Sequence, residues 1–204
     1  MTRVSGDGRP AGQRSGRGVR ERLLDAAYTE IVAGRWARMR MADIAGQAGV
    51  SRQTLYNEFG TKEGLLQAVV LREGECFLDH VVAILMEYQS EPVRAVGQAT
   101  RWTLTAAADN LLLRAIITGD TELLPVLTTR AQPIHVALGE RMAAFLLERW
   151  PELGDLAATV AEVSLRLTIS YVLLPNDSER AAEHVETVVG SMLREAGQQA
   201  SLQR

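Results

Sequence analysis

Apolar residues recur at intervals of three and four positions along most of the chain from Val19 onward. The first such stretch ends at Ala33, and its spacing is set by Leu23, Leu24, Ala27, Tyr28 and Ile31. Gly34 follows as the expected C-terminal cap. No stretch shows the apolar–polar alternation of a strand, and no segment is repeated. The pattern therefore predicts an all-α protein.

About nine helices are expected, bounded by glycine, proline or capping residues. Met41–Ala48 and Ser51–Phe59 should be short helices. Lys62 to about Tyr88 should be one long helix of about 40 Å, at 1.5 Å per residue, which is enough to connect two domains. The others are expected at Pro92–Ala108, Asn110–Thr118, Pro133–Trp150, Asp155–Leu174 and Asp177–Ala196, with a short helix and loop at Leu123–Pro133.

The charge distribution divides the chain more sharply than its net charge of −3. Residues 1–62 hold 11 lysines and arginines against 6 acidic residues, whereas the remainder holds 11 against 19. A basic first part and an acidic body indicate that the first part meets a polyanion. We expect a disordered basic arm at 1–18, a DNA-binding domain at 19–62 and a ligand-binding and dimerisation domain at 63–204. A merely solvated tail is the alternative interpretation of the arm.

The stretch IAGQAGVSRQTLYNEFGTKEGLL, residues 44–66, has the pattern of a helix-turn-helix. Ala45 and Gly49 are four apart, on the side where a second helix is expected to cross closely, and Gly49 accepts a positive φ. Ser51 can cap the following helix. Leu55 and Phe59, with Val50 before them, should point inward. A plain helical hairpin with a solvated polar face is the alternative.

The outward arc of the second short helix carries side chains suited to duplex DNA. Arginine and glutamine can form paired hydrogen bonds with base edges, and threonine can contact a thymine methyl group. Tyrosine and asparagine can bond phosphate oxygens, while a lysine at the start of the long helix can share one phosphate with that helix's N-terminal amides. The expected DNA contacts are Arg40, Ser51, Arg52, Gln53, Thr54, Tyr56, Asn57 and Lys62.

These residues also resemble a known family. The stretch DIAGQAGVSRQTLYNEFGTKEGLL is similar to the signature of TetR-type transcriptional repressors, and the likeness extends over Val19–Leu66. One departure is Arg40, where the family usually has a threonine that caps the second helix. That cap must therefore come from elsewhere, and Arg40 is free to contact a phosphate.

The resemblance implies a homodimer that binds a palindromic operator and leaves it when a small molecule binds the larger domain. A cytoplasmic location is expected separately, because a chain with one cysteine suits a reducing compartment. The two recognition helices would then lie about 34–36 Å apart. The implied dimer interface is formed by the last two long helices, residues 155–196. Their apolar positions are Leu156, Val160, Val163, Leu167, Val185, Val188, Val189, Met192 and Leu193. Packing within one subunit is the alternative for this surface.

The larger domain offers candidates for a cavity that holds a hydrophobic effector. Large side chains could line it, polar groups within apolar runs could meet a head group, and Arg166 is expected to be buried and paired with Glu162 or with a ligand carboxylate. For any single apolar residue, ordinary core packing is the alternative. The candidates are Phe77, Met86, Trp102, Asn110, Ile117, Leu127, Arg130, His135, Phe145 and Arg166.

A looser resemblance concerns the effector. RAIITGDTELLPVLTTRAQPI, ERWPEL and ISYVLLP are similar to a subgroup of these regulators in high-GC actinobacteria. This similarity implies a lipid-related effector such as a fatty acid or an alkane-derived molecule, with a drug-like or aromatic effector as the alternative. A helical small-molecule-binding protein that does not select DNA sequences is the rival function.

Other classes find no support in the sequence. His80, His135 and His184 fall in separate helices, and the single cysteine, Cys76, excludes a zinc site of several thiolates and an intrachain disulfide. There is no P-loop, dinucleotide fingerprint or G-x-S-x-G motif. We therefore expect neither enzyme activity nor a cofactor. No run approaches the roughly 20 apolar residues that span a bilayer, so no membrane partner is expected.

Overall fold

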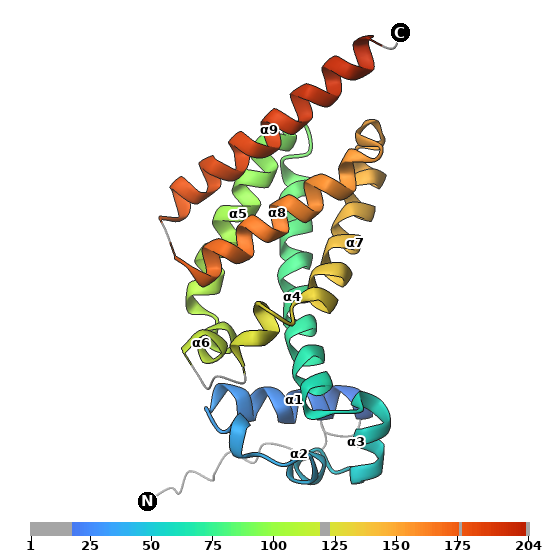
Figure 1. The fold of residues 1–204 in the computed structure, drawn as a ribbon, viewed down its shortest axis with the longest axis vertical. Coiled ribbons are helices and arrows are strands. Elements are labelled where there is room, and N and C mark those ends of the chain that lie inside the picture. The colour runs from blue at the N-terminus through green and yellow to red at the C-terminus, as the bar shows by residue number, and fades with distance from the viewer. Residues whose placement is uncertain (1–17, 119–122, 176, 203–204) are drawn as a thin grey trace, which may run out of the picture.

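The structure, a computed structural model, describes residues 18–118, 123–175 and 177–202 (Figure 1). These residues form nine α-helices and three short 3-10 helices, with no strand among them. The predicted all-α fold is confirmed; the basic arm lies almost wholly outside the described residues. The elements are α1 (Val19–Val32), η2 (Trp36–Arg38), α2 (Met41–Gln47), α3 (Arg52–Phe59), α4 (Lys62–Glu87), α5 (Pro92–Asp109), α6 (Leu111–Thr118), η3 (Leu124–Leu127), α7 (Gln132–Arg149), η4 (Pro151–Leu153), α8 (Leu156–Leu173) and α9 (Ser178–Leu202).

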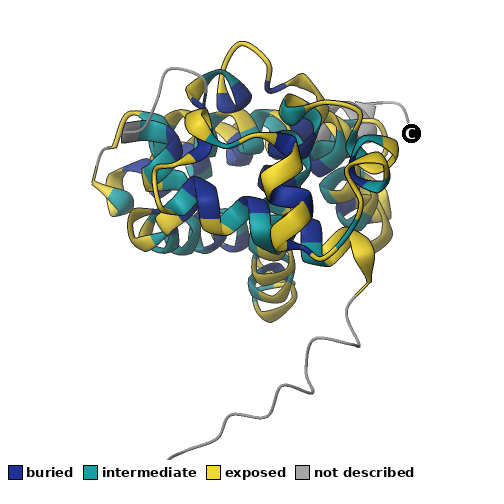
Figure 2. Ribbon diagram, turned by 90° about the horizontal axis from the view of Figure 1, so that it is seen from below, coloured by how far each residue is buried: buried dark blue, intermediate teal, exposed yellow. Residues whose placement is uncertain are grey.

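The helices α1, α2 and α3 gather at one end of the molecule, and α4 runs from them into a bundle formed by the later helices (Figure 1). Within that bundle α9 packs on α5, and α8 packs mainly on α7. Figure 2 looks onto the α2–α3 end, where exposed and buried stretches alternate along the helices that face the viewer. The long helix α4 therefore connects α1–α3 to the bundle.

Two clusters of buried side chains hold this arrangement together. The first joins α1–α3 to the lower half of α4, and it also takes in Leu112, Ile116 and Leu127 from the bundle. The second lies at the other end of the bundle, around Leu85, Trp150 and Val185. Since α6 packs directly on α1, the hydrophobic core does not break at residue 62. The expected domain boundary at residues 62–63 therefore does not coincide with a gap in packing.

The short helix η2, between α1 and α2, was not predicted from the sequence. Trp36 begins the short helix η2, and its indole is 2% exposed within the first buried cluster. The predicted cap Gly34 precedes it with φ at +67°, and the Gly34 N–H donates to Ile31 O. The glycine ends α1 as predicted, and Trp36 anchors the connection that leads to α2.

Candidate nucleic-acid interface and ligand cavity

The turn between α2 and α3 has the local chemistry predicted for it. Gly49 has φ at +66°, and Ser51 Oγ accepts from Thr54 N at 3.0 Å. Leu55 is fully buried. One detail was wrong: Gly49 is exposed, and no atom lies within 4 Å of where its Cβ would be. The glycine is therefore required by its backbone conformation and not by a close helix crossing.

Residues of the outward arc pair with each other along α3. Gln53 Nε2 donates to Asn57 Oδ1 at 2.8 Å, and the Arg52 guanidinium lies 5.2 Å from the centre of the Tyr56 ring. Arg52, Gln53 and Asn57 are exposed, as predicted, while Tyr56 is half-buried. Both pairs join residues four apart, so each side chain is partly ordered by its neighbour on the same face. The three exposed side chains are held by residues of their own helix. Because they are exposed, they are accessible to duplex DNA.

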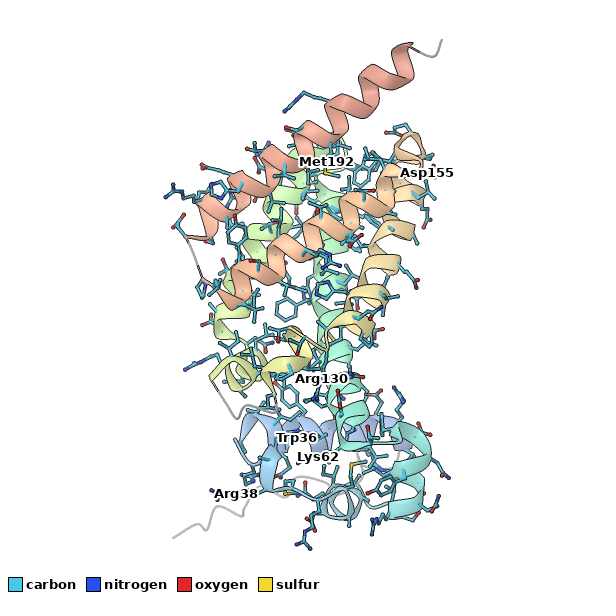
Figure 3. All side chains as sticks on the ribbon, viewed as in Figure 1. Trp36, Arg38, Lys62, Arg130, Asp155 and Met192 are labelled. Carbon is cyan, nitrogen blue, oxygen red and sulfur yellow. The ribbon has the colours of Figure 1, made fainter. Side chains whose placement is uncertain are left out.

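Arginine and lysine side chains surround this helix without forming part of it. Arg40 is exposed, and its backbone N–H donates to Asp43 Oδ2 at 3.1 Å. Asp43 thus satisfies the backbone N–H of the residue that precedes α2, which is one half of a capping box, and the Arg40 guanidinium remains at the surface. Arg38, which the sequence analysis missed, is also exposed and points outward at this end of the molecule (Figure 3). Its signal was the basic run RWARMR, residues 35–40.

Lys62 is half-buried and faces back toward η2. Its Nζ donates to Ala37 O at 3.2 Å and lies 5.1 Å from the centre of the Trp36 ring (Figure 3). Thr61 caps α4, because its Oγ1 accepts from Gly64 N at 2.9 Å. The lysine therefore fixes the start of the long helix against the η2 turn, and its charge stays at the end that the sequence predicts to bind DNA.

The buried Glu30 carboxylate links α1 to the elements that follow it in the helix-turn-helix region. Glu30, at 4% exposure, accepts two hydrogen bonds from Arg35, at 2.7 and 2.9 Å, and one from Gln47 Nε2 at 3.2 Å. The Arg35 bonds are the main cause that holds the pKa of Glu30 below its ordinary value. This one side chain ties the end of α1 to both the η2 turn and the end of α2.

A cavity of about 180 Å³ lies in the bundle between the two buried clusters. One face of α4, from Val70 to Leu85, forms its longest wall, a distance of about 22 Å at 1.5 Å per residue. Helices α5, α6, α7 and α8 and the short helix η3 complete the lining. Because its side chains are mostly aliphatic, the cavity suits a hydrophobic molecule.

The structure brings together only part of the predicted ligand set. Phe77, Asn110 and Leu127 line the cavity. Met86 is 43% exposed instead, and Ile117 lies outside the lining. Trp102 stacks on His80 and contacts Phe77 from outside, while Phe145 packs edge-on against Trp150 in the second cluster. Trp102 and Phe145 therefore pack against neighbouring aromatic rings and do not line the cavity.

The predicted cationic head-group residues also lie outside the lining. Arg130 forms an ion pair with Glu63 at 3.3 Å, between the bundle and the first turn of α4 (Figure 3). Arg166 was expected to be buried, but its side chain is 63% exposed and its Nε donates to Glu162 at 2.8 Å. His135 is half-buried, and burial and nearby Arg166 lower its pKa.

The surface of α8 and α9 divides between two roles. Val160, Val185 and Val189, expected at a subunit interface, are buried within one subunit, whereas Val188 is 38% exposed.

By length and composition α8 is apolar enough to cross a membrane, with a mean hydropathy of 1.4 and only 17% of its residues buried. The Glu162–Arg166 ion pair midway along it argues against a bilayer, whose interior penalises charged side chains.

Comparison with known proteins agrees with this geometry. The model of the family described as "Bacterial regulatory proteins, tetR family" matches residues 23–69, and that of "Bacterial Tetracyclin repressor, C-terminal domain" matches residues 91–191. The HTH-type transcriptional regulator AlkX of Mycobacterium tuberculosis is 32% identical over 164 residues, which cover 79% of this chain and 78% of the relative.

Solved structures show the same architecture. The TetR family repressor AlkX from Dietzia sp. strain DQ12-45-1b, implicated in biodegradation of n-alkanes, matches with a TM-score of 0.73 and 27% identity, over 90% of this chain and 98% of the other. The fatty acid degradation regulator FadR from Bacillus halodurans shares the fold at a TM-score of 0.52 and 18% identity, over 85% and 96% of the two chains. The chain therefore belongs to the TetR family of bacterial transcriptional regulators.

Proposed function

We propose that this protein is a cytoplasmic, ligand-responsive repressor that binds a palindromic operator as a homodimer and is released by a small hydrophobic effector. One observation carries the proposal. The helix α4 begins beside an exposed polar recognition helix and then forms the longest wall of an apolar cavity. A molecule that fills the cavity therefore touches the same rigid element that positions the DNA-binding end.

Within this proposal the α3 side chains divide between two tasks. Arg52, Gln53 and Thr54 contact base edges, because they lie near the N-terminal end of the helix, which enters the major groove first. Tyr56, Asn57, Arg40 and Lys62 contact phosphates and fix the register. We also assign Arg38 to the residues that contact phosphates, because its side chain is exposed.

The dimer interface is assigned to the outer faces of α8 and α9. Val163 and Val188 remain partly exposed after the inner faces have packed. The two copies of α3 must lie about 34–36 Å apart to enter successive major grooves. An effector releases the DNA only if it binds more tightly to a conformation in which that spacing is lost.

The choice of a chain-like effector has two supports. The cavity follows α4 for much of that helix's length, and two relatives are named in connection with n-alkanes and fatty acid degradation. The second support describes those two proteins, and it is extended to this chain as part of the proposal.

Gel-shift titrations against the upstream region of its own gene and against random duplex test the DNA-binding part. Arg52→Ala or Gln53→Ala should cost about 1–3 kcal/mol on the operator and relax sequence preference. Lys62→Ala should weaken both duplexes equally. Arg149→Ala, which removes an exposed cation at the far end of α7, is the control. Equal loss on both duplexes for Arg52→Ala would refute base reading, and a protein that shows no preference for any upstream duplex would be a ligand-binding protein only.

A further inference from the structure

The polar groups in the cavity wall limit what kind of molecule it accepts. Besides aliphatic and aromatic carbon, the lining holds three threonines, Asn110, Ser164 and one ionisable residue, Glu73. No lysine, arginine or histidine is among the lining residues in the described part of the chain. The wall therefore offers neutral polar groups and one carboxyl, but no cation.

Ser164 and Asn110 differ in whether their side chains are already hydrogen-bonded. Ser164 Oγ is buried and has no hydrogen-bond partner among the described residues. Asn110 Oδ1 already accepts from Leu113 N at 2.9 Å, where it caps α6. A buried hydroxyl without a partner is unfavourable, so a ligand able to exchange a hydrogen bond with Ser164 would be stabilised there.

Glu73 is the charged exception, and its surroundings decide which head group it can meet. Its carboxylate lies 3.7 Å from Arg72 Nε. Arg72 is committed mainly to the small domain, since its Nη1 is 2.9 Å from Asp25 and 3.3 Å from Glu21. Burial raises the pKa of Glu73, and the charge of Arg72 opposes that rise. The Glu73 carboxylate is therefore a hydrogen-bond acceptor that shares Arg72 with two other acids.

We propose that the cavity binds an unbranched hydrophobic chain with an uncharged hydroxyl head, and that Glu73 accepts the hydroxyl's hydrogen bond. This inference rests on the proposed function, because it names the effector class for the same cavity. The lining follows α4 for about 22 Å, and this length favours a linear chain. A fully apolar chain would offer no hydrogen bond to Glu73 or to Ser164.

A fatty acid, one effector class that the sequence implies, fits this wall poorly. Its carboxylate would share the cavity with the Glu73 carboxylate and would find no cation in the lining. Two carboxylates in one low-dielectric site cannot both remain ionised, so binding would require uptake of a proton. An alkylamine would lose more hydration than an alcohol in an apolar cavity, and repulsion from Arg72 would offset part of its attraction to the Glu73 carboxylate. The alcohol avoids both penalties.

Isothermal titration of the full-length protein with decanol, decanoate, decylamine and decane tests the head group at one chain length, below the concentrations at which these molecules aggregate. We expect decanol to bind at least about ten times more tightly than decanoate, the ratio that a hydrogen bond to a charged acceptor can supply. Glu73→Gln should shrink that ratio, mainly by improving decanoate binding. Glu75→Gln, which removes an exposed acid two residues along α4, should leave it unchanged.

The possible outcomes separate this inference from the proposed function. Decanoate or decylamine binding as tightly as decanol would overturn the inference, as would an unchanged ratio in a folded Glu73→Gln protein or binding of none of the four molecules. Gel shifts on the same preparations measure operator binding independently. Specific operator binding with the wrong head-group preference would refute the hydroxyl assignment alone, whereas failure to bind any operator would refute the repressor.

Discussion

Arg72 provides the sharpest test of how the two parts of the molecule are joined. It lies on α4, and its Nη1 donates to Asp25 Oδ1 at 2.9 Å and to Glu21 Oε2 at 3.3 Å, both on α1. The Arg72 side chain is 20% exposed, while its two partners are 41–50% exposed. Glu21 and Asp25 lie one turn apart on α1, so the arginine also screens two like charges from each other.

We expect Arg72→Gln to lower the free energy of unfolding by about 1–2 kcal/mol. A hydrogen bond to a charged group contributes about 1.5–3 kcal/mol, and an exposed ion pair about 0–1 kcal/mol. This contact lies between the two cases, because the cation is largely buried and its acids are not. High salt should reduce the difference between the variant and the wild type, since the exposed acids are screened. Urea unfolding at low and high salt measures both quantities.

Two further variants isolate the contact. A double-mutant cycle of Arg72→Gln with Asp25→Asn should give a coupling energy of about 1 kcal/mol, because the residues touch. Arg94→Gln is the matched control, as Arg94 pairs with Glu91 on an exposed surface with both side chains 55% exposed, and it should change stability by less than about 0.5 kcal/mol. If Arg72→Gln costs no more than Arg94→Gln, the ion pairs do not stabilise the α1–α4 junction.

The remaining predictions concern the core, the pH response and the cavity wall. Leu55→Ala, at a fully buried position, should destabilise the protein by about 2–5 kcal/mol in urea unfolding, and a loss under 1 kcal/mol would contradict the packing described for α3. Because Arg35 depresses the pKa of Glu30, the stability that Glu30 contributes above its unfolded pKa should be lost as pH falls through its lower folded value. Acid unfolding below the ordinary pKa of 4.5 should therefore be steeper in wild type than in Glu30→Gln, and equal slopes would refute the linkage. Ser164→Ala removes a hydroxyl without a hydrogen-bond partner, so thermal melting should show unchanged stability or a gain of up to about 1 kcal/mol, and a clear loss would show that the hydroxyl is satisfied.

The sequence was most informative where structure is local. Ser51 caps α3, Gly49 takes a positive φ and Leu55 is buried, all as predicted. Each outcome depends on residues within one or two turns, and hydrophobic periodicity, capping and glycine backbone preferences act over that range. Helix boundaries agree to within about one or two residues for the same reason, except for α9, which continues to Leu202.

Tertiary structure decided the ligand cavity and the contacts that join the two parts of the molecule. Periodicity shows which side of a helix turns inward, but it does not show which neighbour that side meets. Phe77 and Trp102 are both large aromatic residues, yet only Phe77 lines the cavity. Arg166 in an apolar helix lies at the surface, whereas Glu73 in a charged run lines the cavity. The sequence by itself determined the helices and the exposed recognition face, because those depend on near neighbours. Only the arrangement of α4, α5, α7 and α8 around the cavity determined which polar groups meet a ligand, because that depends on residues far apart in the chain.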